Sequence, residues 1–169
     1  MAHPDADLVA ACRQGDRRAF DALLERHRGW VLNLAYQMLG AADEAQDAAQ
    51  EVLVRVFTRL GGFRGEATFA TWLRRITVNE CINRLGRRGR EGELPPELAS
   101  ARSSPDEGVA VRAAIQSLSP PLRAALVLRE LHGASYREIA HILRVPVGTV
   151  RSRLAAAREK LRELLSEEA

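Results

Sequence analysis

The sequence predicts an all-α protein made of two small helical domains joined by a flexible linker. Apolar residues recur at spacings of three and four along most of the chain, and no segment has the pattern of a β-strand. This periodicity stops between Gly86 and Gly108, where Gly, Pro, Ser and acidic residues dominate. We therefore expect an N-terminal domain over residues 1–85, a linker over 86–108 and a C-terminal domain over 109–169.

The composition favours a packed, soluble protein over a disordered or membrane-embedded chain. Of the 169 residues, 46% are hydrophobic and 28% are charged, and the formal net charge is +3. No apolar run approaches the roughly 20 residues of a membrane span, and no leader pattern opens the chain. Cys12 and Cys81 lack the spacing of metal ligands. We expect reduced, buried thiols and a cytoplasmic protein.

Three helices precede the most basic part of the N-terminal domain. A short first helix is capped by Asp5 or Asp7, and Gly15 ends it. The second helix is expected over residues 16–40 and the third over residues 43–60, each followed by glycine.

The third helix has an acidic beginning, with Asp43, Glu44, Asp47 and Glu51 in its first turns. Negative charge at a helix N-terminus is locally favourable, so dipole stabilisation is the simplest explanation. A docking surface for a basic partner is a second, and a metal or acid–base site is a third. The third would need carboxylates from another element, and the sequence supplies none. We therefore expect no metal and no catalytic residue.

Residues 63–90 carry a basic pattern that fits two structures. Between Arg64 and Gly92, seven arginines stand against three glutamates. The apolar positions lie first on one side, with Phe69, Trp72, Leu73 and Ile76, and then almost opposite, with Val78, Cys81, Ile82 and Leu85. Such a helix is either covered on two sides or bent. Arginines and amides beside aromatic residues suit contact with nucleic acid, and a core helix with a solvated basic rim fits equally well.

The C-terminal domain is expected to open with two helices that cover a helical hairpin. The first spans residues 109–118, and Ser119 followed by two prolines begins the second, which Gly133 ends. The hairpin follows over Ser135–Leu165. Ser135 and Glu138 form a capping-box signature, and Pro and Gly then mark a turn before the second helix of the hairpin.

One face of that last helix is apolar, and the opposite face combines small residues with cations. Its centre holds Ser152, Ala155 and Ala156, and Arg151 and Arg158 lie to one side. Small residues permit a close approach to a surface, and flanking cations suit phosphates. A solvated basic face on an ordinary hairpin is the alternative, and the turn between the helices favours recognition of the DNA major groove.

With both stretches in view, the chain resembles the sigma factors of bacterial RNA polymerase, specifically the compact extracytoplasmic-function (ECF) group. Residues 41–85, which include TFATWLRRITVNECINRL, are similar to the family's region 2. Residues 118–164, which include GTVRSRLAAAREKL, are similar to region 4. No third sigma domain separates them, unlike in the larger primary sigma factors. The resemblance implies a promoter-specificity subunit with no catalytic centre and no cofactor.

The resemblance also implies roles for region 2. Its third helix would bind the β′ clamp helices of core RNA polymerase, through Asp47, Gln50, Glu51, Val54, Arg55 and Phe57. The following stretch would recognise and melt the −10 element and hold a flipped base, at a cost of a few kcal/mol of lost stacking. Its candidate DNA-binding residues are Arg64, Thr68, Phe69, Trp72, Arg75, Asn79, Asn83 and Arg84.

Region 4 would place its last helix in the major groove of the −35 element and lean on the β flap tip. Its candidate DNA-binding residues are Thr149, Arg151, Ser152, Arg153, Ala155, Ala156 and Arg158. Several relatives have bulky or basic side chains where this chain has the two alanines. We therefore expect −35 recognition here to rely more on DNA shape and on phosphate contacts.

Two other functions would account for parts of the sequence. A free-standing helix-turn-helix regulator would need neither the basic stretch nor the docking helix. A DNA-processing hydrolase would use Asp43, Asp47 and Glu51 with a divalent metal, and nothing else in the chain completes such a site. The resemblance further implies an anti-sigma factor as partner, no direct membrane insertion, and a nucleoid location when the chain is bound to polymerase.

Overall fold

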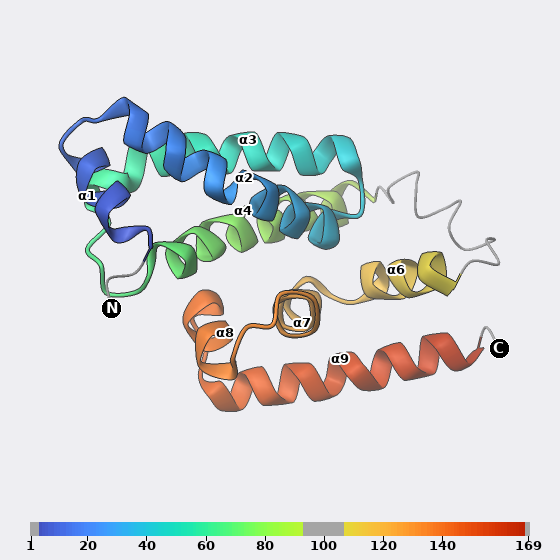
Figure 1. Ribbon diagram of the computed structural model, residues 1–169. Coiled ribbons are helices and arrows are strands. Elements are labelled where there is room, and N and C mark those ends of the chain that lie inside the picture. Colours follow the sequence, from blue (N-terminus) through green and yellow to red (C-terminus); the bar gives the residue numbers. More distant parts are fainter. Residues whose placement is uncertain (1–3, 93–106, 168–169) are drawn as a thin grey trace.

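The computed structural model describes residues 4–92 and 107–167, and the regular structure of these residues is helical throughout (Figure 1). Two layers lie one above the other. The N-terminal unit comprises α1 (Ala6–Arg13), α2 (Arg17–Leu39), α3 (Ala42–Arg59), a 3₁₀ turn η1 (Leu60–Gly62) and α4 (Phe69–Glu91). The C-terminal unit comprises α6 (Glu107–Ser117), α7 (Pro120–Leu126), a π-helical turn η2 (Val127–Leu131), α8 (Tyr136–Leu143) and α9 (Val147–Glu167).

The beginnings of the first two helices differ in chemistry. The carboxylate of Asp16 caps α2, because its Oδ1 accepts from the backbone N–H groups of Arg18 and Ala19 at 2.9 and 3.2 Å. Asp5 occupies the N-cap position of α1 without a side-chain cap bond. Its carboxylate instead lies 2.8 Å from both Arg26 and His27 of α2. Of the two caps expected for α1, Asp5 or Asp7, Asp5 occupies the N-cap position, but its side chain ties α1 to α2.

Helix α4 continues to Glu91, so the linker expected over 86–108 is wrong at its start. Two glycines fall inside these last turns, and each costs a helix about 1 kcal/mol relative to alanine. Arg88 compensates by an ion pair with Glu44 and by donating from Nη1 to the Leu39 carbonyl at 2.9 Å. The remaining linker residues 93–106 lie outside the described residues.

Helix α4 is covered on two sides, which explains its change of apolar face. Its first half contributes Phe69 and Leu73 to a core shared with α1, α2 and α3. Its second half contributes Val78, Cys81 and Leu85 to a core that continues into α7, α8 and α9. In Figure 1, α4 accordingly lies between α3 and the C-terminal unit. The sequence allowed a helix that is covered on two sides or one that is bent, and the structure shows that α4 is covered on two sides.

A buried arginine joins the two units. Arg123 of α7 is 6% exposed, and its Nη1 donates to the Met38 carbonyl at 2.6 Å and to Gln116 Oε1 at 2.8 Å. Its Nη2 donates to the Leu118 carbonyl at 3.0 Å. Gly40 permits this contact, because it has φ +77° and a Cβ there would lie 2.8 Å from Gln116 Cδ. Burial lowers the pKa of Arg123 to about 10.

Aromatic and arginine contacts extend this interface toward the beginning of α4. The rings of Trp30 and His132 meet edge to face with centroids 5.2 Å apart, and the Arg74 guanidinium lies 4.9 Å from the Trp30 ring. Burial, and to a smaller extent the charge of Arg74, lowers the pKa of His132. Nη2 of Arg75 donates to the His141 carbonyl in α8 at 2.9 Å. The described chain is therefore closed, with its two units in direct contact.

Candidate nucleic-acid interface

The last helix, α9, presents the small-residue face expected from the sequence. Arg151, Ser152, Ala155 and Ala156 are exposed, whereas Leu154 on the other side is fully buried. The remaining predicted members of this surface are half-buried Thr149 and Arg153 and exposed Arg158. The structure thus brings the seven predicted residues onto one helix, with its apolar side held against the core. Such a surface can approach the floor of a groove closely.

Local chemistry fixes both ends of α8, the helix that precedes α9. Ser135 Oγ accepts from the Glu138 N–H at 3.1 Å, and Glu138 Oε2 accepts from the Ser135 N–H at 2.7 Å, which completes the capping box. This backbone bond lowers the pKa of the Glu138 carboxyl. After α8, Arg144 has φ +53°, and the Val145 N–H bonds the Ala140 carbonyl at 3.1 Å. The turn therefore places a left-handed residue where glycine is usual.

Arg158 already has an anionic partner. Its Nη2 and Nε lie 2.6 and 3.1 Å from Glu130 Oε1, and both side chains are 46% exposed. An exposed pair of this kind contributes at most about 1 kcal/mol. A phosphate can therefore replace Glu130 at little cost.

The residues that begin α4 form an aromatic cluster instead of a fully exposed surface. Phe69 is 3% exposed, and its ring lies 5.8 Å from Trp72, 6.2 Å from Phe63 and 5.3 Å from His27. Trp72 is half-buried. The structure therefore gives Phe69, a predicted DNA-binding residue, a place in the core. Direct contact with a base would need this cluster to move.

An open pocket lies beside this cluster. It has a volume of about 540 Å³ and is lined by α1 and by the loop that ends at α4, a size within the range of about 300–1,000 Å³ usual for ligand sites. Thr68, on this loop, is exposed and caps α4 by accepting from the Thr71 N–H at 3.1 Å. Arg64 is exposed on the same loop. The loop thus places the Thr68 hydroxyl at the edge of a pocket lined by Phe63 and Phe69, and it also carries the Arg64 guanidinium.

The other predicted residues of α4 follow one another along the helix. Trp72, Arg75, Asn79 and Asn83 are spaced by three and four residues, which places them on one side. Asn79 and Asn83 are exposed. Arg75 is occupied by α8, as described above, and Nε of Arg84 donates to Glu80 Oε1 at 2.7 Å. The structure therefore brings these side chains together, with two of the arginines already engaged.

The outer side of α3 exposes apolar groups. Val54 is 58% exposed and Phe57 is 65% exposed, which is unusual for residues of their size. Gln50 and Asp47 are exposed one and two turns earlier than Val54. We call Asp47, Gln50, Val54 and Phe57 the α3 patch. It has the composition of a protein-binding surface, with an apolar centre and a polar rim.

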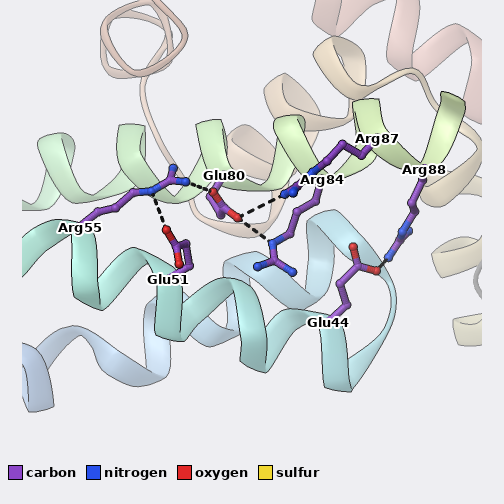
Figure 2. Close-up of polar contacts among 7 residues, drawn as sticks. All are labelled: Glu44, Glu51, Arg55, Glu80, Arg84, Arg87 and Arg88. Carbon is purple, nitrogen blue, oxygen red and sulfur yellow. Dashed lines mark hydrogen bonds and ion pairs between the residues drawn. The ribbon is translucent and has the colours of Figure 1, made fainter. Parts of the chain in front are cut away.

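Glu51 and Arg55, also predicted on α3, point toward α4 and a buried carboxylate (Figure 2). Arg55 lies 3.2 Å from Glu51 and 2.7 Å from Glu80. Glu80 is 1% exposed and was not among the predicted site residues. The spacing of Glu80 and Arg84 indicates an i, i+4 pair, but the burial of Glu80 depends on how α3 packs.

Comparison with known proteins gives a consistent result. Residues 23–91 match the family model "Sigma-70 region 2", and residues 108–161 match "Sigma-70, region 4". The ECF RNA polymerase sigma factor SigM of Mycobacterium tuberculosis is 37% identical over 165 residues, which cover 95% of this chain and 84% of that protein.

Two solved structures are also similar. CnrH, in complex with the cytosolic domain of CnrY, has a TM-score of 0.75 at 28% identity and covers 98% of this chain and 99% of that one. The sigma factor RpoE of Bartonella quintana, in complex with the anti-sigma factor NepR, has a TM-score of 0.70 at 26% identity and covers 87% of this chain and 96% of that one.

Proposed function

The chain belongs to the ECF group of the sigma-70 family and is an alternative sigma subunit, and we propose how its surfaces divide the work of transcription initiation. The N-terminal unit, which ends with α4 at Glu91, serves as region 2, and the C-terminal unit, which begins with α6 at Glu107, serves as region 4. The observation that carries this division is that each half has an exposed surface of different chemistry: the apolar α3 patch in one and the small-residue, basic face of α9 in the other.

The α3 patch docks on core RNA polymerase, at the β′ clamp helices. Exposed Val54 and Phe57 supply apolar area, and Asp47 and Gln50 supply the polar rim. Glu51 and Arg55 form the inner edge of the same surface. Large apolar side chains at the centre of an interface usually carry most of its binding energy.

The pocket beside the α1–loop junction captures a base of the −10 element. Thr68 offers a polar contact at its edge, and Arg64 lies on the same loop. Trp72, Asn79 and Asn83 lead away from the pocket along α4. Removing a base from the duplex costs a few kcal/mol, which stacking and backbone contacts along this track offset. Phe69 acts from the core, as support for Trp72.

The α9 face reads the −35 element while region 4 rests on the β flap tip. Ala155 and Ala156 allow close approach but have no hydrogen-bonding side chains. Specificity therefore depends on DNA shape and on phosphate contacts from Arg151, Arg153 and Arg158.

The closed arrangement must open for both elements to be bound at once. Arg75, a predicted −10 DNA-binding residue, donates to the His141 carbonyl in the helix-turn-helix at 2.9 Å. Elements about 25 base pairs apart on B-DNA are separated by about 85 Å, at about 3.4 Å per base pair. A closed chain cannot span that distance. Polymerase stabilises the open form by binding each unit at its own site.

A partner that binds both units in the closed form would keep the chain inactive. The similar sigma factor RpoE is seen in complex with an anti-sigma factor, and we propose a partner of the same class here. No helix within the described residues is long and apolar enough to cross a membrane. We propose that the chain acts in the cytoplasm, on the nucleoid when in holoenzyme. Sigma factors are transcription initiation factors, and we propose no catalytic centre in this one.

Reconstitution tests the proposal. The purified chain is mixed with core bacterial RNA polymerase and a genomic promoter library, and co-elution and run-off transcripts are measured. We expect stable co-elution and new, specific start sites. Failure to bind core, together with tight binding of a DNA duplex by the chain alone, would contradict the proposal and favour a free-standing regulator.

A further inference from the structure

A carboxylate buried between α3 and α4 gathers arginines from both helices. Glu80 Oε2 lies 2.7 Å from Arg55 Nη2, and Glu80 Oε1 lies 2.7 Å from Arg84 Nε and 3.9 Å from Arg87 Nη2 (Figure 2). The Glu80 side chain is 2% exposed, whereas those of Arg55, Arg84 and Arg87 are 29%, 20% and 57% exposed. The Glu80 carboxylate is thus buried, and the three arginine side chains that surround it are partly exposed to solvent.

Stability alone does not account for this arrangement. Burying a carboxylate is unfavourable unless it is paired, and well-packed apolar residues in the same volume are often equally stabilising. The same two helices are already joined by an apolar core and by a second ion pair, between Arg88 and Glu44. A buried ion pair is therefore better explained by the specific positions that it imposes on the side chains it binds.

The two closest arginines belong to different surfaces. Arg55 is at the inner edge of the polymerase-docking surface and bridges Glu80 to Glu51. Arg84, a predicted DNA-binding residue, comes directly after Asn83 on α4 and lies about 100° further around the helix. Glu80 binds Arg84 through Nε, which leaves the guanidinium fork of Nη groups as the edge for a phosphate. One carboxylate therefore sets the position of a docking arginine and of a DNA-binding arginine.

We propose that Glu80 is a positioning residue for promoter opening: it ties Arg84 to the docking helix α3, so that the guanidinium is aligned for the strand that leaves the duplex. This proposal rests on the proposed function of region 2. Promoter opening depends on Arg84 being ordered before DNA binds. Ordering a long side chain during binding costs conformational entropy and therefore lowers affinity for the opened strand. Polymerase docking depends on Glu80 less, because Arg55 keeps its contact with Glu51.

The test measures open-complex formation with core polymerase and a promoter obtained by reconstitution. Glu80→Gln keeps the shape and removes the charge, and Arg88→Gln is the matched control that breaks the other ion pair between the same helices. Permanganate reactivity is followed on the duplex promoter, and binding of the holoenzyme to a −35 duplex, which offers no opened strand, is measured beside it. We expect E80Q to slow opening of the duplex promoter at least tenfold and to change affinity for the −35 duplex less than twofold. R88Q should change both less than twofold.

A double-mutant cycle separates positioning from a general loss of structure. If Glu80 acts through Arg84, E80Q added to Arg84→Ala lowers opening by less than a further twofold. Glu80→Met, which fills the same volume without charge, should reproduce the tenfold loss and serves where E80Q does not fold. Equal effects of E80Q and R88Q, or a full tenfold loss by E80Q in the R84A background, would overturn the inference. Failure of the unmodified chain to bind core would instead contradict the proposed function.

Discussion

The two helical units hold their functional residues in opposite ways. In the C-terminal unit the predicted DNA-binding side chains project from α9, and Arg151, Ser152, Ala155 and Ala156 are exposed. In the N-terminal unit, half of the predicted set is exposed, and the other half, Phe69, Trp72, Arg75 and Arg84, contacts the rest of the fold. Phe69 is in the core, Arg84 is bound by Glu80, and Arg75 is bound by α8.

This difference matches two kinds of recognition. The edges of base pairs are accessible in an intact duplex, so a rigid helix with an exposed face is sufficient to read them. An opened strand offers phosphates and unstacked bases that a protein must hold in place. Side chains already ordered by internal pairs are suited to that task, provided that DNA can displace some of these pairs.

The largest effect is expected at the α3 patch. Phe57→Asp should lower affinity for core polymerase about 100-fold, because a central aromatic residue is commonly worth about 2–4 kcal/mol at an interface. Phe57 is 65% exposed and its ring meets that of Phe20 edge to face with centroids 5.1 Å apart, so the free energy of unfolding should fall by only about 1 kcal/mol. Fluorescence titration with core polymerase and urea unfolding measure the two quantities.

The matched control lies in the other unit. Val111 is 40% exposed on α6, and Val111→Asp should leave affinity for core within twofold. Equal losses of affinity for core polymerase in the two variants would mean that exposed apolar side chains of the two units do not differ in their role in docking.

The next largest effect is expected where the units meet. Arg123→Met leaves the carbonyls of Met38 and Leu118 without this donor, and should lower the free energy of unfolding by about 2–3 kcal/mol. Arg112→Met, at an exposed position of α6, is the control and should change it by at most about 0.5 kcal/mol. Denaturant unfolding measures both, and an unchanged R123M midpoint would exclude Arg123 as the residue that joins the units.

A smaller effect is expected from single cations on α9. Arg151→Ala should lower the salt dependence of promoter binding by about one counterion, because one phosphate contact is lost. Arg158→Ala should do the same, since Glu130 is displaced at little cost. Binding of a −35 duplex at several salt concentrations gives the slope. Slopes equal to that of the unmodified chain in both variants would remove these residues from the phosphate contacts.

The sequence predicted the C-terminal unit better than the N-terminal one, for a physical reason. The capping box of Ser135 and Glu138 and the stripe of α9 are local patterns, and the structure contains both. The helical fold class was likewise predicted from periodicity. The burial of Phe69 and Glu80 depends on residues 20 or more positions away in the chain, which periodicity does not encode.

The end of α4 and the contact between the units were also beyond local patterns. Gly86 favours an end to the helix, but the pairing of Arg88 with Glu44 overrides it. The packing of Arg123 against Met38 likewise joins residues 85 positions apart in the sequence.

The smallest predicted effect concerns pH. Burial lowers the pKa of His132 below its usual value of 6.5, so the closed form binds fewer protons than the open one as pH falls below about 6.5. Its stability should therefore decrease on acidification from pH 7.5 to 5.5, by more than in His132→Gln. Energy transfer between dyes on the two units measures how much of the chain is closed at each pH. An identical pH response in the unmodified chain and in His132→Gln would contradict this prediction.

The central claim, that the chain is a sigma subunit whose two units separate to bind a promoter, is tested by a change in distance. Dyes are placed at Gln14→Cys and Arg137→Cys, both at exposed positions, one in each unit. Cys12 is replaced by Ser, and Cys81 is left because it is buried and its pKa is raised to about 12. We predict efficient energy transfer in the free chain and a loss of transfer when core polymerase and promoter DNA are added. Efficient transfer that persists in a transcribing complex would contradict the account.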